Sequence, residues 1–350
     1  MRIAHPALPL FVGAACLVLT LTGCTDEDGT THARQTPSVS TAPTLAPALT
    51  AAQARDVITR YSKTNNEANT NRSRRLLDSV EGGPLYAMSV SDYTETEGLP
   101  AADRKPYKPW SYDSANAKLY IPRLGAEQDR WFVAALAGQK GKAPSRLGVF
   151  AEHPRHKRWE MVSVVDLDSR KLPDVALDRG YATAVPADGN KQPATGAHLL
   201  RAAVLDNFVT GGTNTGRKVF ASTKSSRRQI KVHDKTGIRY GKQATTVFAG
   251  AANRYTDAYA LKTTDGGALV LFSHTHTQTD TVAHSGLQIN PSKDDRAWLH
   301  DMPRTSITYT FVCNDAATVP AKARPSRLIG YTCARTDAAG PPVQSWTNRA

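Results

Sequence analysis

Two histidines separated by one residue, His274 and His276, are the side chains whose spacing first suggests chemistry. On a β-strand, residues two positions apart point to the same face, so we expect Gln278 and Asp280 to line up with both imidazoles. Two imidazoles placed in this way can ligate zinc when a third ligand completes the site. The same face could also line a ligand pocket without any metal.

A third zinc ligand is difficult to assign. His284 and His300 are the available histidines downstream, and neither stands at a recognisable ligand spacing from the pair. Within residues 272–280, threonines also stand at every second position from 275 on. Such a polar run is typical of the solvent-facing side of an antiparallel sheet. We therefore expect no metal and no cofactor, and interpret this run as a polar sheet face.

Basic side chains are concentrated between residues 217 and 242, where the only acidic residue is Asp234. They are Arg217, Lys218, Lys224, Arg227, Arg228, Lys231, Lys235, Arg239 and Lys242. A field of this sign attracts anions within a Debye length of about 8 Å. The stretch is either a solvated face or a contact for anionic lipid or a wall polymer. Nucleic acid is not an expected partner, because Tyr240 is the only ring between 222 and 242 on which bases could stack.

Acid–base chemistry has candidates but no motif. The aspartates and tyrosines available in the N-terminal half are Asp56, Tyr61, Tyr86, Tyr93 and Asp166. Nothing in their spacing separates them from core tyrosines and surface aspartates. The sequence contains no Gly-x-Ser-x-Gly elbow, no phosphate-binding loop, no Ser-x-x-Lys and no Cys-x-x-Cys. We therefore assign no catalytic residue.

The N-terminal segment predicts the location of the protein. Arg2 precedes an apolar run over residues 7–21, which is too short to span a bilayer comfortably but fits the core of a signal peptide. The run closes on Leu21-Thr22-Gly23-Cys24, which resembles the lipobox of bacterial lipoproteins. The resemblance implies removal of residues 1–23 and a diacylglyceryl group on Cys24, anchoring the protein at the extracytoplasmic face of the cell membrane. The alternative is an ordinary secretory signal with a chance cysteine.

Cys313 and Cys333 are the two remaining cysteines beyond the signal peptide and the lipidation site. Both lie in apolar, strand-like runs that could be neighbours in a hairpin. In an oxidising compartment such a pair favours a disulfide over two free buried thiols. Either outcome is structural.

The N-terminal half reads as a tether followed by a helix and strands. Residues 24–49 are rich in Thr, Pro, Ser and Ala and are expected to be a disordered tether. Thr50 and Gln53 have the form of a capping box for a helix that Gly82-Gly83-Pro84 stops. Strands are expected at 118–121, 131–137, 147–152 and 159–167, with an exposed basic turn at 153–158.

The C-terminal half repeats this order after a linker over residues 186–193. Thr195 can cap a second helix, which Gly211-Gly212 ends. Strands are expected at 229–233, 244–249, 255–263, 268–281, 307–314 and 327–336, and Asp265-Gly266-Gly267 is typical of a hairpin turn.

This order predicts an α+β fold of two tandem units, each a long helix packed on a curved antiparallel sheet, over residues 50–185 and 194–340, with a tail at 341–350. Trp131-Phe132-Val133 and Trp159-Glu160-Met161-Val162 resemble the tryptophan-opened strands of cystatin and nuclear-transport-factor-2-like cone folds. With Leu172-Pro173-Asp174 and Gly180-Tyr181-Ala182, the chain is also similar to secreted actinobacterial lipoproteins of unknown function. That resemblance implies no catalytic residue.

The composition sets the outer limits. The chain has 350 residues, 40% of them hydrophobic and 21% charged, with a net charge of +13. These values exclude a disordered protein, a collagen, a coiled coil and a polytopic membrane protein. We expect a non-enzymatic, lipid-anchored module that binds a small ligand or an envelope partner. The alternatives are an acid–base enzyme with a cone-shaped pocket and a structural protein held to anionic surfaces by its basic face.

Overall fold

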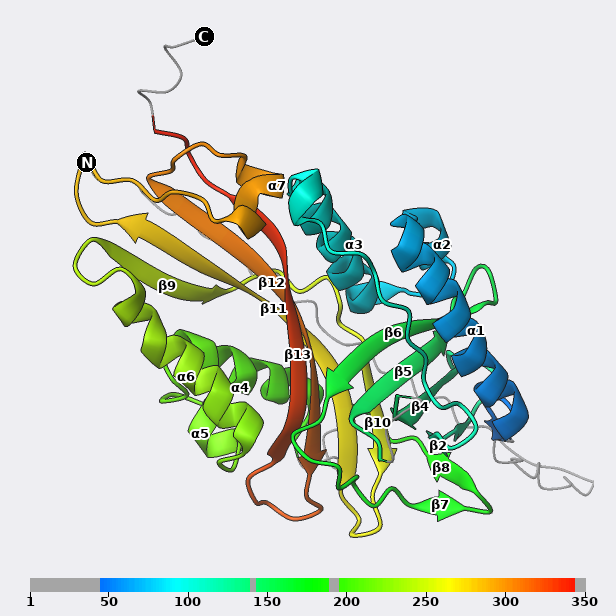
Figure 1. The fold of residues 1–350 in the computed structure, drawn as a ribbon. Helices are drawn as coiled ribbons and strands as arrows, with labels where there is room; N and C mark the ends of the chain where they lie inside the picture. Colours follow the sequence, from blue (N-terminus) through cyan, green and yellow to red (C-terminus); the bar gives the residue numbers. More distant parts are fainter. Residues whose placement is uncertain (1–44, 139–142, 189–194, 344–350) are drawn as a thin grey trace, which may run out of the picture. The chain divides into compact units, whose positions relative to one another are not determined.

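The computed structural model describes residues 45–138, 143–188 and 195–343 (Figure 1), without the side chains of 236–239. The signal segment 1–23, Cys24 and residues 25–44 of the expected tether lie outside the described residues. The described residues belong to one compact unit. Below, residues 45–188 are called the N-terminal half and residues 195–343 the C-terminal half.

Three helices open the N-terminal half: α1 (Ala51–Asn71), α2 (Arg74–Asp78) and α3 (Gly83–Gly98). The capping box at Thr50 is confirmed, because its hydroxyl accepts from the Gln53 amide while Gln53 accepts from the Thr50 amide. The expected stop at Gly82-Gly83-Pro84 is wrong, because α1 already ends at Asn71, where Arg72 caps it in the left-handed conformation. The Gly-Gly-Pro run instead begins α3, which the sequence did not predict: Pro84 lies in the first turn, where a helix needs no amide donor.

The four strands expected next are confirmed and form an antiparallel sheet in the order β2-β4-β5-β6. They are β2 (Lys118–Tyr120), β4 (Trp131–Leu136), β5 (Arg146–Glu152) and β6 (Trp159–Asp166). A smaller sheet joins β1 (Ala46–Pro47), β3 (Pro122–Leu124), β8 (Tyr181–Thr183) and β7 (Leu177–Asp178). The expected tether was therefore too long: its last residues pair as β1, and Ala48 and Leu49 are buried.

A second, larger sheet dominates the C-terminal half. Its strands are β9 (Ala244–Gly250), β10 (Ala258–Lys262), β11 (Ala268–Val282), β12 (Ser306–Val319) and β13 (Arg327–Ala339). β10 pairs with the start of β11 and β9 with its end, on the edge opposite β12. The Asp265-Gly266-Gly267 turn joins β10 to β11 as predicted, with the Asp265 carboxylate accepting from the Gly267 amide.

The helices of the C-terminal half are α4 (Ala197–Val209), α5 (Gly216–Val219), α6 (Lys224–Arg239) and the short α7 (Arg296–Leu299). The strand expected at 229–233 is wrong, because these residues lie inside α6. A capping box of Thr223 and Ser226 starts this helix. The basic residues recur every three or four positions along it. This helical period predicts the observed structure better than the short apolar–polar alternation at 229–233 does.

The expected division into two tandem units is not confirmed. One hydrophobic cluster contains Phe132 and Phe150 of the N-terminal half together with Leu269 and Leu271 of β11. The opposite face of the large sheet, with Val270 and Phe272, forms a second cluster with α4. The halves therefore share a core through β11.

The predicted disulfide between Cys313 and Cys333 is present. The two residues are direct partners in the β12–β13 ladder, with Cα atoms 4.1 Å apart. Cross-strand neighbours therefore bring the two thiols within bonding reach.

Candidate functional site

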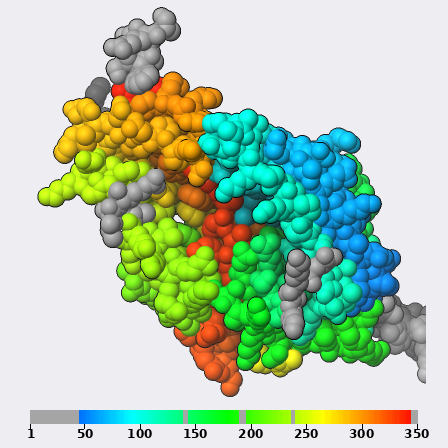
Figure 2. All heavy atoms as spheres, in the orientation of Figure 1, coloured from blue at the N-terminus to red at the C-terminus, as the bar shows by residue number. Residues whose placement is uncertain are grey.

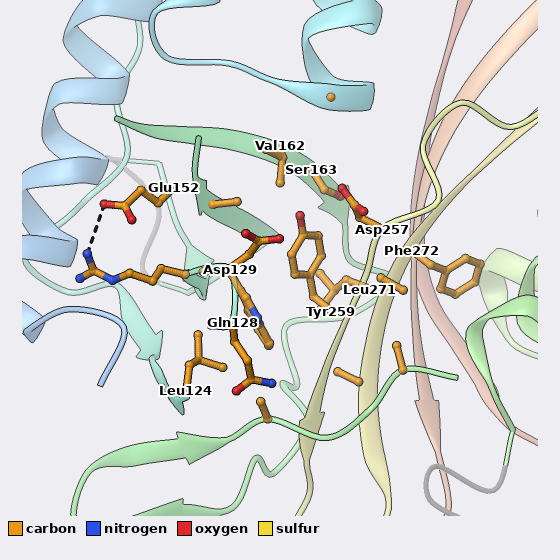
Figure 3. Close-up of a pocket in the computed structure, with 18 of the residues that line it drawn as sticks. Leu124, Gln128, Asp129, Glu152, Val162, Ser163, Asp257, Tyr259, Leu271 and Phe272 are labelled. Carbon is orange, nitrogen blue, oxygen red and sulfur yellow. Dashed lines mark hydrogen bonds and ion pairs between the residues drawn. The ribbon is translucent and has the colours of Figure 1, made fainter. Parts of the chain in front are cut away.

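A cavity with a volume of about 1010 Å³ lies where the two halves meet (Figure 3). One wall comes from the loop before β4 and the facing residues of β4, β5 and β6. The other comes from the segment 254–260, which leads into β10, and from β11. A cavity of this size, built at a seam between sheets, is typical of a small-molecule site.

Two of the aromatic rings that line the cavity contact each other. Trp131 opens β4 and Tyr259 lies in β10, and their ring centroids are 5.2 Å apart in an edge-to-face arrangement. Burial raises the pKa of the Tyr259 phenol, and the carboxylates of Asp257 and Asp129 raise it further. The phenol is therefore neutral, and Figure 3 shows its hydroxyl pointing toward Ser163 and Asp257.

Ser163 of β6 supplies an unpartnered polar group. The residue is 4% exposed, and its hydroxyl has no hydrogen-bond partner among the described residues. Ser163 lines the cavity. Because an unsatisfied buried hydroxyl costs free energy, its presence here is a feature that a bound ligand would explain.

Charges around the cavity fall into two groups. Glu152 forms an ion pair with Arg130 at 3.2 Å, and Glu160 forms one with Arg158 at 2.6 Å. Asp129 and Asp257 have no ion-pair partner among the described residues, and both are exposed. The rim next to Tyr259 therefore carries two carboxylates without an ion pair, with Arg254 also on the rim and Arg201 close enough for its charge to interact with Asp257.

The histidine pair lies elsewhere, on the face of β11 that α4 and α6 cover. His274, His276, Gln278 and Asp280 share one face as predicted, since His276 Nδ1 lies 3.3 Å from His274 Nε2 and Gln278 donates to Asp280. The expected solvent exposure is wrong: His274 is 1% and Asp280 0% exposed. The error follows from the missed α6, whose Gln229 packs over this face.

The buried histidines form a hydrogen-bonded chain that ends on a carboxylate. His274 Nδ1 lies 2.6 Å from Asp315 Oδ2, and Gln229 donates to the other oxygen of Asp315. Burial lowers the pKa of His276 to about 3, so this imidazole is neutral. An aspartate–histidine pair can serve a nucleophile, but the group next to His276 is the sulfur of Cys313, which the disulfide occupies.

The same disulfide involves two of the three described residues whose ligand atoms lie close enough together to bind a metal ion. Ligand atoms of His274, Cys313 and Cys333 lie within 4.8 Å of one another. A metal would need the thiolates, and both sulfurs are bonded to each other, so this set does not fit a metal ion. His284 and His300, the suggested third ligands, are exposed.

Tyr61 and Tyr93, two of the acid–base candidates, belong to a buried polar network that also contains Glu81. Tyr61 and Asn65 of α1 each donate to Glu81 Oε1 at 2.8 Å. The other carboxylate oxygen has no hydrogen-bond partner of good geometry among the described residues. Burial raises the pKa of Glu81 to about 7, although the hydroxyls of Ser89 and Tyr61 oppose the shift.

The other acid–base candidates do not join this network. Asp56 is exposed, Tyr86 is half-buried, and Asp166 forms an ion pair with Arg146 at 2.7 Å. Glu81 was not foreseen, because a single glutamate before Gly-Gly-Pro resembles a surface turn. Its one sequence signal is its place directly after the apolar Leu76, Leu77 and Val80.

The basic stretch is largely a helical surface. Arg217 and Lys218 are exposed on α5, and Lys224, Arg227, Arg228, Lys231 and Lys235 are exposed on α6. Positions 224, 227, 228, 231 and 235 repeat at helical spacing and share one side of α6. Lys242 is exposed after α6, and the side chain of Arg239 lies outside the described residues. Figure 2 shows the outer surface of α5 and α6 in yellow-green.

The second basic cluster, residues 153–158, is the β5–β6 hairpin turn, as predicted. Arg155, His156 and Lys157 are exposed, whereas Arg158 binds Glu160 and Asp78. In the part of the chain that the structure describes, no helix is long and apolar enough to cross a membrane.

The unpartnered hydroxyl gives a stability test. We expect Ser163→Ala to raise the free energy of unfolding of the ligand-free protein by about 1 kcal/mol, because it removes an unsatisfied buried group. Ser273→Ala is the matched control: this serine is equally buried in a strand, but its hydroxyl donates to Asn314 at 2.8 Å. Its loss should lower the free energy by about 1 kcal/mol. Urea unfolding curves measure both, and equal destabilisation by the two substitutions would contradict the assignment.

Comparison with known proteins gives a family and no activity. The domain of unknown function DUF8094 matches residues 45–340. A lipoprotein of Streptomyces coelicolor is 76% identical over 351 residues, covering 100% of this chain and 99% of its own length. A second S. coelicolor lipoprotein is 27% identical and covers 81% of the chain and 83% of its own length. A Streptomyces avermitilis lipoprotein is 29% identical over 62% of the chain and 63% of its own length.

No solved structure matches the chain, so the expected likeness to cystatin and nuclear-transport-factor-2-like folds is not confirmed. The match over residues 45–340 takes in both halves and every segment that lines the cavity. By this match and by its 76% identical relative, the chain belongs to the DUF8094 family, whose relatives here are Streptomyces lipoproteins.

Proposed function

We propose that the protein is a lipid-anchored extracytoplasmic module that binds a small ligand in the cavity between its two halves. The observation that carries the proposal is the cavity itself, about 1010 Å³ in volume, with Trp131 and Tyr259 set edge to face and Ser163 unpartnered in its wall. Apolar area with a few placed polar groups is the general character of ligand sites.

An acid–base enzyme is the competing proposal, and the geometry favours it less. The carboxyl with a pKa near neutrality, Glu81, does not line the cavity, and neither does its partner Tyr61. A general acid or base must lie within hydrogen-bond reach of its substrate. The polar groups that do line the cavity include no nucleophile held against a base.

Native and denaturing mass spectra of exported protein, residues 25–350, test ligand binding. We expect the native mass to exceed the mass of the bare chain, and the excess to disappear on denaturation. Ala258→Trp places a bulky ring in the cavity wall and should abolish the excess, whereas Ala249→Trp, on an exposed position of β9, should preserve it. A native mass equal to the bare chain, or an adduct that survives Ala258→Trp but not Ala249→Trp, would contradict the proposal.

For the anchor, we propose a diacylglyceryl group on Cys24, supported by the lipobox-like Leu21-Thr22-Gly23-Cys24 and by the lipoprotein relatives. Two or more acyl chains hold a protein durably at a membrane, which one chain does not. The Pro- and Thr-rich residues after Cys24 would keep the compact unit away from the bilayer.

Cys24→Ala should move the protein from the membrane fraction to the soluble fraction, because no acyl chain can then be attached. Cys16→Ala, within the apolar run, is the matched control and should leave the protein with the membrane. Immunoblots of separated fractions measure both. Retention of the Cys24→Ala protein at the membrane would refute lipid anchoring through this residue.

A second role is supported by the exposed basic side of α6. We propose that it contacts the anionic headgroups of the membrane to which the protein is anchored. The five basic residues at 224, 227, 228, 231 and 235 have no ion-pair partner among the described residues. Each such charge near an anionic membrane is worth about 1 kcal/mol.

Sedimentation with vesicles tests this contact, using the unlipidated chain from residue 25. Exchange of Arg227, Arg228 and Lys231 for Gln should weaken binding to phosphatidylglycerol vesicles at least about tenfold. A control with the same change in charge exchanges Arg155, Lys157 and Arg170, which are also exposed, and should change binding little. Equal losses from both triple variants would indicate net charge alone, and binding to isolated wall polymer instead of vesicles would reassign the partner.

A further inference from the structure

We infer that the ligand of the cavity is an organic cation, a protonated amine or a quaternary ammonium group held against Trp131 and Tyr259 between the carboxylates of Asp129 and Asp257. This inference rests on the proposed ligand-binding function and specifies its chemistry. It follows from three separate features of the same cavity: the rings, the carboxylates and the buried hydroxyl.

The aromatic rings supply the first argument. The face of an aromatic ring is electron-rich and attracts cations, and tryptophan does so most strongly. Trp131 and Tyr259 contact each other edge to face, with an interplanar angle of 61°, so a cation binds beside this pair, against the part of each ring that the other does not cover. Trp131 belongs to the N-terminal half and Tyr259 to the C-terminal half, so a cation held against the pair would contact both halves.

The carboxylates supply the second argument. Asp129 and Asp257 both raise the pKa of the Tyr259 phenol, which places their charges close to the ring. Figure 3 shows both carboxylates next to Tyr259. Neither forms an ion pair among the described residues, although the charge of Arg201 interacts with Asp257, so a ligand cation would be attracted by both carboxylates.

The nearby arginines do not replace that cation. Arg130 pairs with Glu152, and Arg201 donates to the backbone carbonyls of Ser273, Thr256 and Asp257. Arg254 is exposed on the rim and has no ion pair among the described residues. It reduces the negative field but lies outside the ring pair that defines the site.

The hydroxyl of Ser163 supplies the third argument, independent of charge. It is buried and unpartnered, and it lies on the β6 wall of the cavity, where Figure 3 shows the Tyr259 hydroxyl pointing toward it. The hydroxyls of Ser163 and Tyr259 could therefore both form hydrogen bonds with the polar group of a ligand whose cationic group lies against the rings. A carboxylate or phosphate in that position would face the charges of Asp129 and Asp257 and be repelled.

Three probes of nearly equal shape test the sign of the ligand charge. Choline carries a positive charge, 3,3-dimethylbutan-1-ol is its neutral carbon analogue, and 3,3-dimethylbutanoate is negative. With the chain 25–350, isothermal titration should give choline an affinity about tenfold higher than the alcohol, as a cation–π contact and two carboxylates require. The butanoate should not bind measurably.

Substitutions at the two aspartates test whether the preference for choline arises at this site. Asp129→Asn with Asp257→Asn should raise the dissociation constant of choline at least about fivefold and leave the alcohol unchanged. Glu127→Gln removes an exposed carboxylate on the same rim and is the matched control. Circular dichroism confirms that each variant is folded.

Other outcomes overturn the inference. Equal binding of choline and the alcohol, preference for the butanoate, or no binding of any probe at its highest soluble concentration would each exclude a cation site. If the native mass still carries an adduct that Ala258→Trp removes, ligand binding in the cavity stands and only the charge assigned to the ligand is wrong. If that adduct is also absent, the proposed function fails with it.

Discussion

The pairing of β11 with β12, from Ala268 opposite Val319 to Thr281 opposite Ser306, is the interaction on which the rest of the structure depends. Both faces of this ladder are buried, so alternate residues of one strand must suit two different neighbours. Leu269 and Leu271 face the N-terminal half and complete its core. Phe272 and His274 face α4 and α6. The described residues consequently form one compact unit with the large sheet between two layers, and removing either layer would expose one face of the ladder.

The polar side of this ladder can be buried because most of its groups bond to one another, an exception being the side-chain oxygen of Asn207. His276, His274 and Asp315 form a chain, and Gln229 of α6 and Asn207 of α4 extend it. Such a network costs little only when it is nearly complete. This requirement explains the two-sided character of α6, whose inner side carries buried serines and Gln229 while its outer side carries the basic residues. The sequence of α6 thus supplies both the polar groups that bind the helix to the sheet and the positive charges on its exposed side.

Local signals were enough for much of the fold. The Thr50 capping box, the strand predicted at 131–137, the Asp-Gly-Gly turn and the Cys313–Cys333 pair each depend on neighbours in sequence or on one partner. All four are confirmed, the strand as β4 over Trp131–Leu136. The strand predicted at 229–233 is wrong because the apolar–polar alternation on which it rested is short. Without α6 in the predicted fold, the buried histidine face was also predicted to be exposed to solvent. Glu81 and the cavity could not be derived from spacing. Trp131, Ser163 and Tyr259 are brought together only by the packing of two sheets.

The cavity follows from the same arrangement, since two twisted sheets that share a core separate toward its edge. Its lining from both halves makes a ligand that contacts Trp131 and Tyr259 the central claim. A crystal structure of exported protein, purified without dialysis or chelator, tests it most directly. We predict electron density for a non-protein molecule in the cavity, in contact with this ring pair and with a polar atom within hydrogen-bond distance of the Ser163 hydroxyl. A well-ordered cavity holding only water, or one closed by its own side chains, would contradict the account.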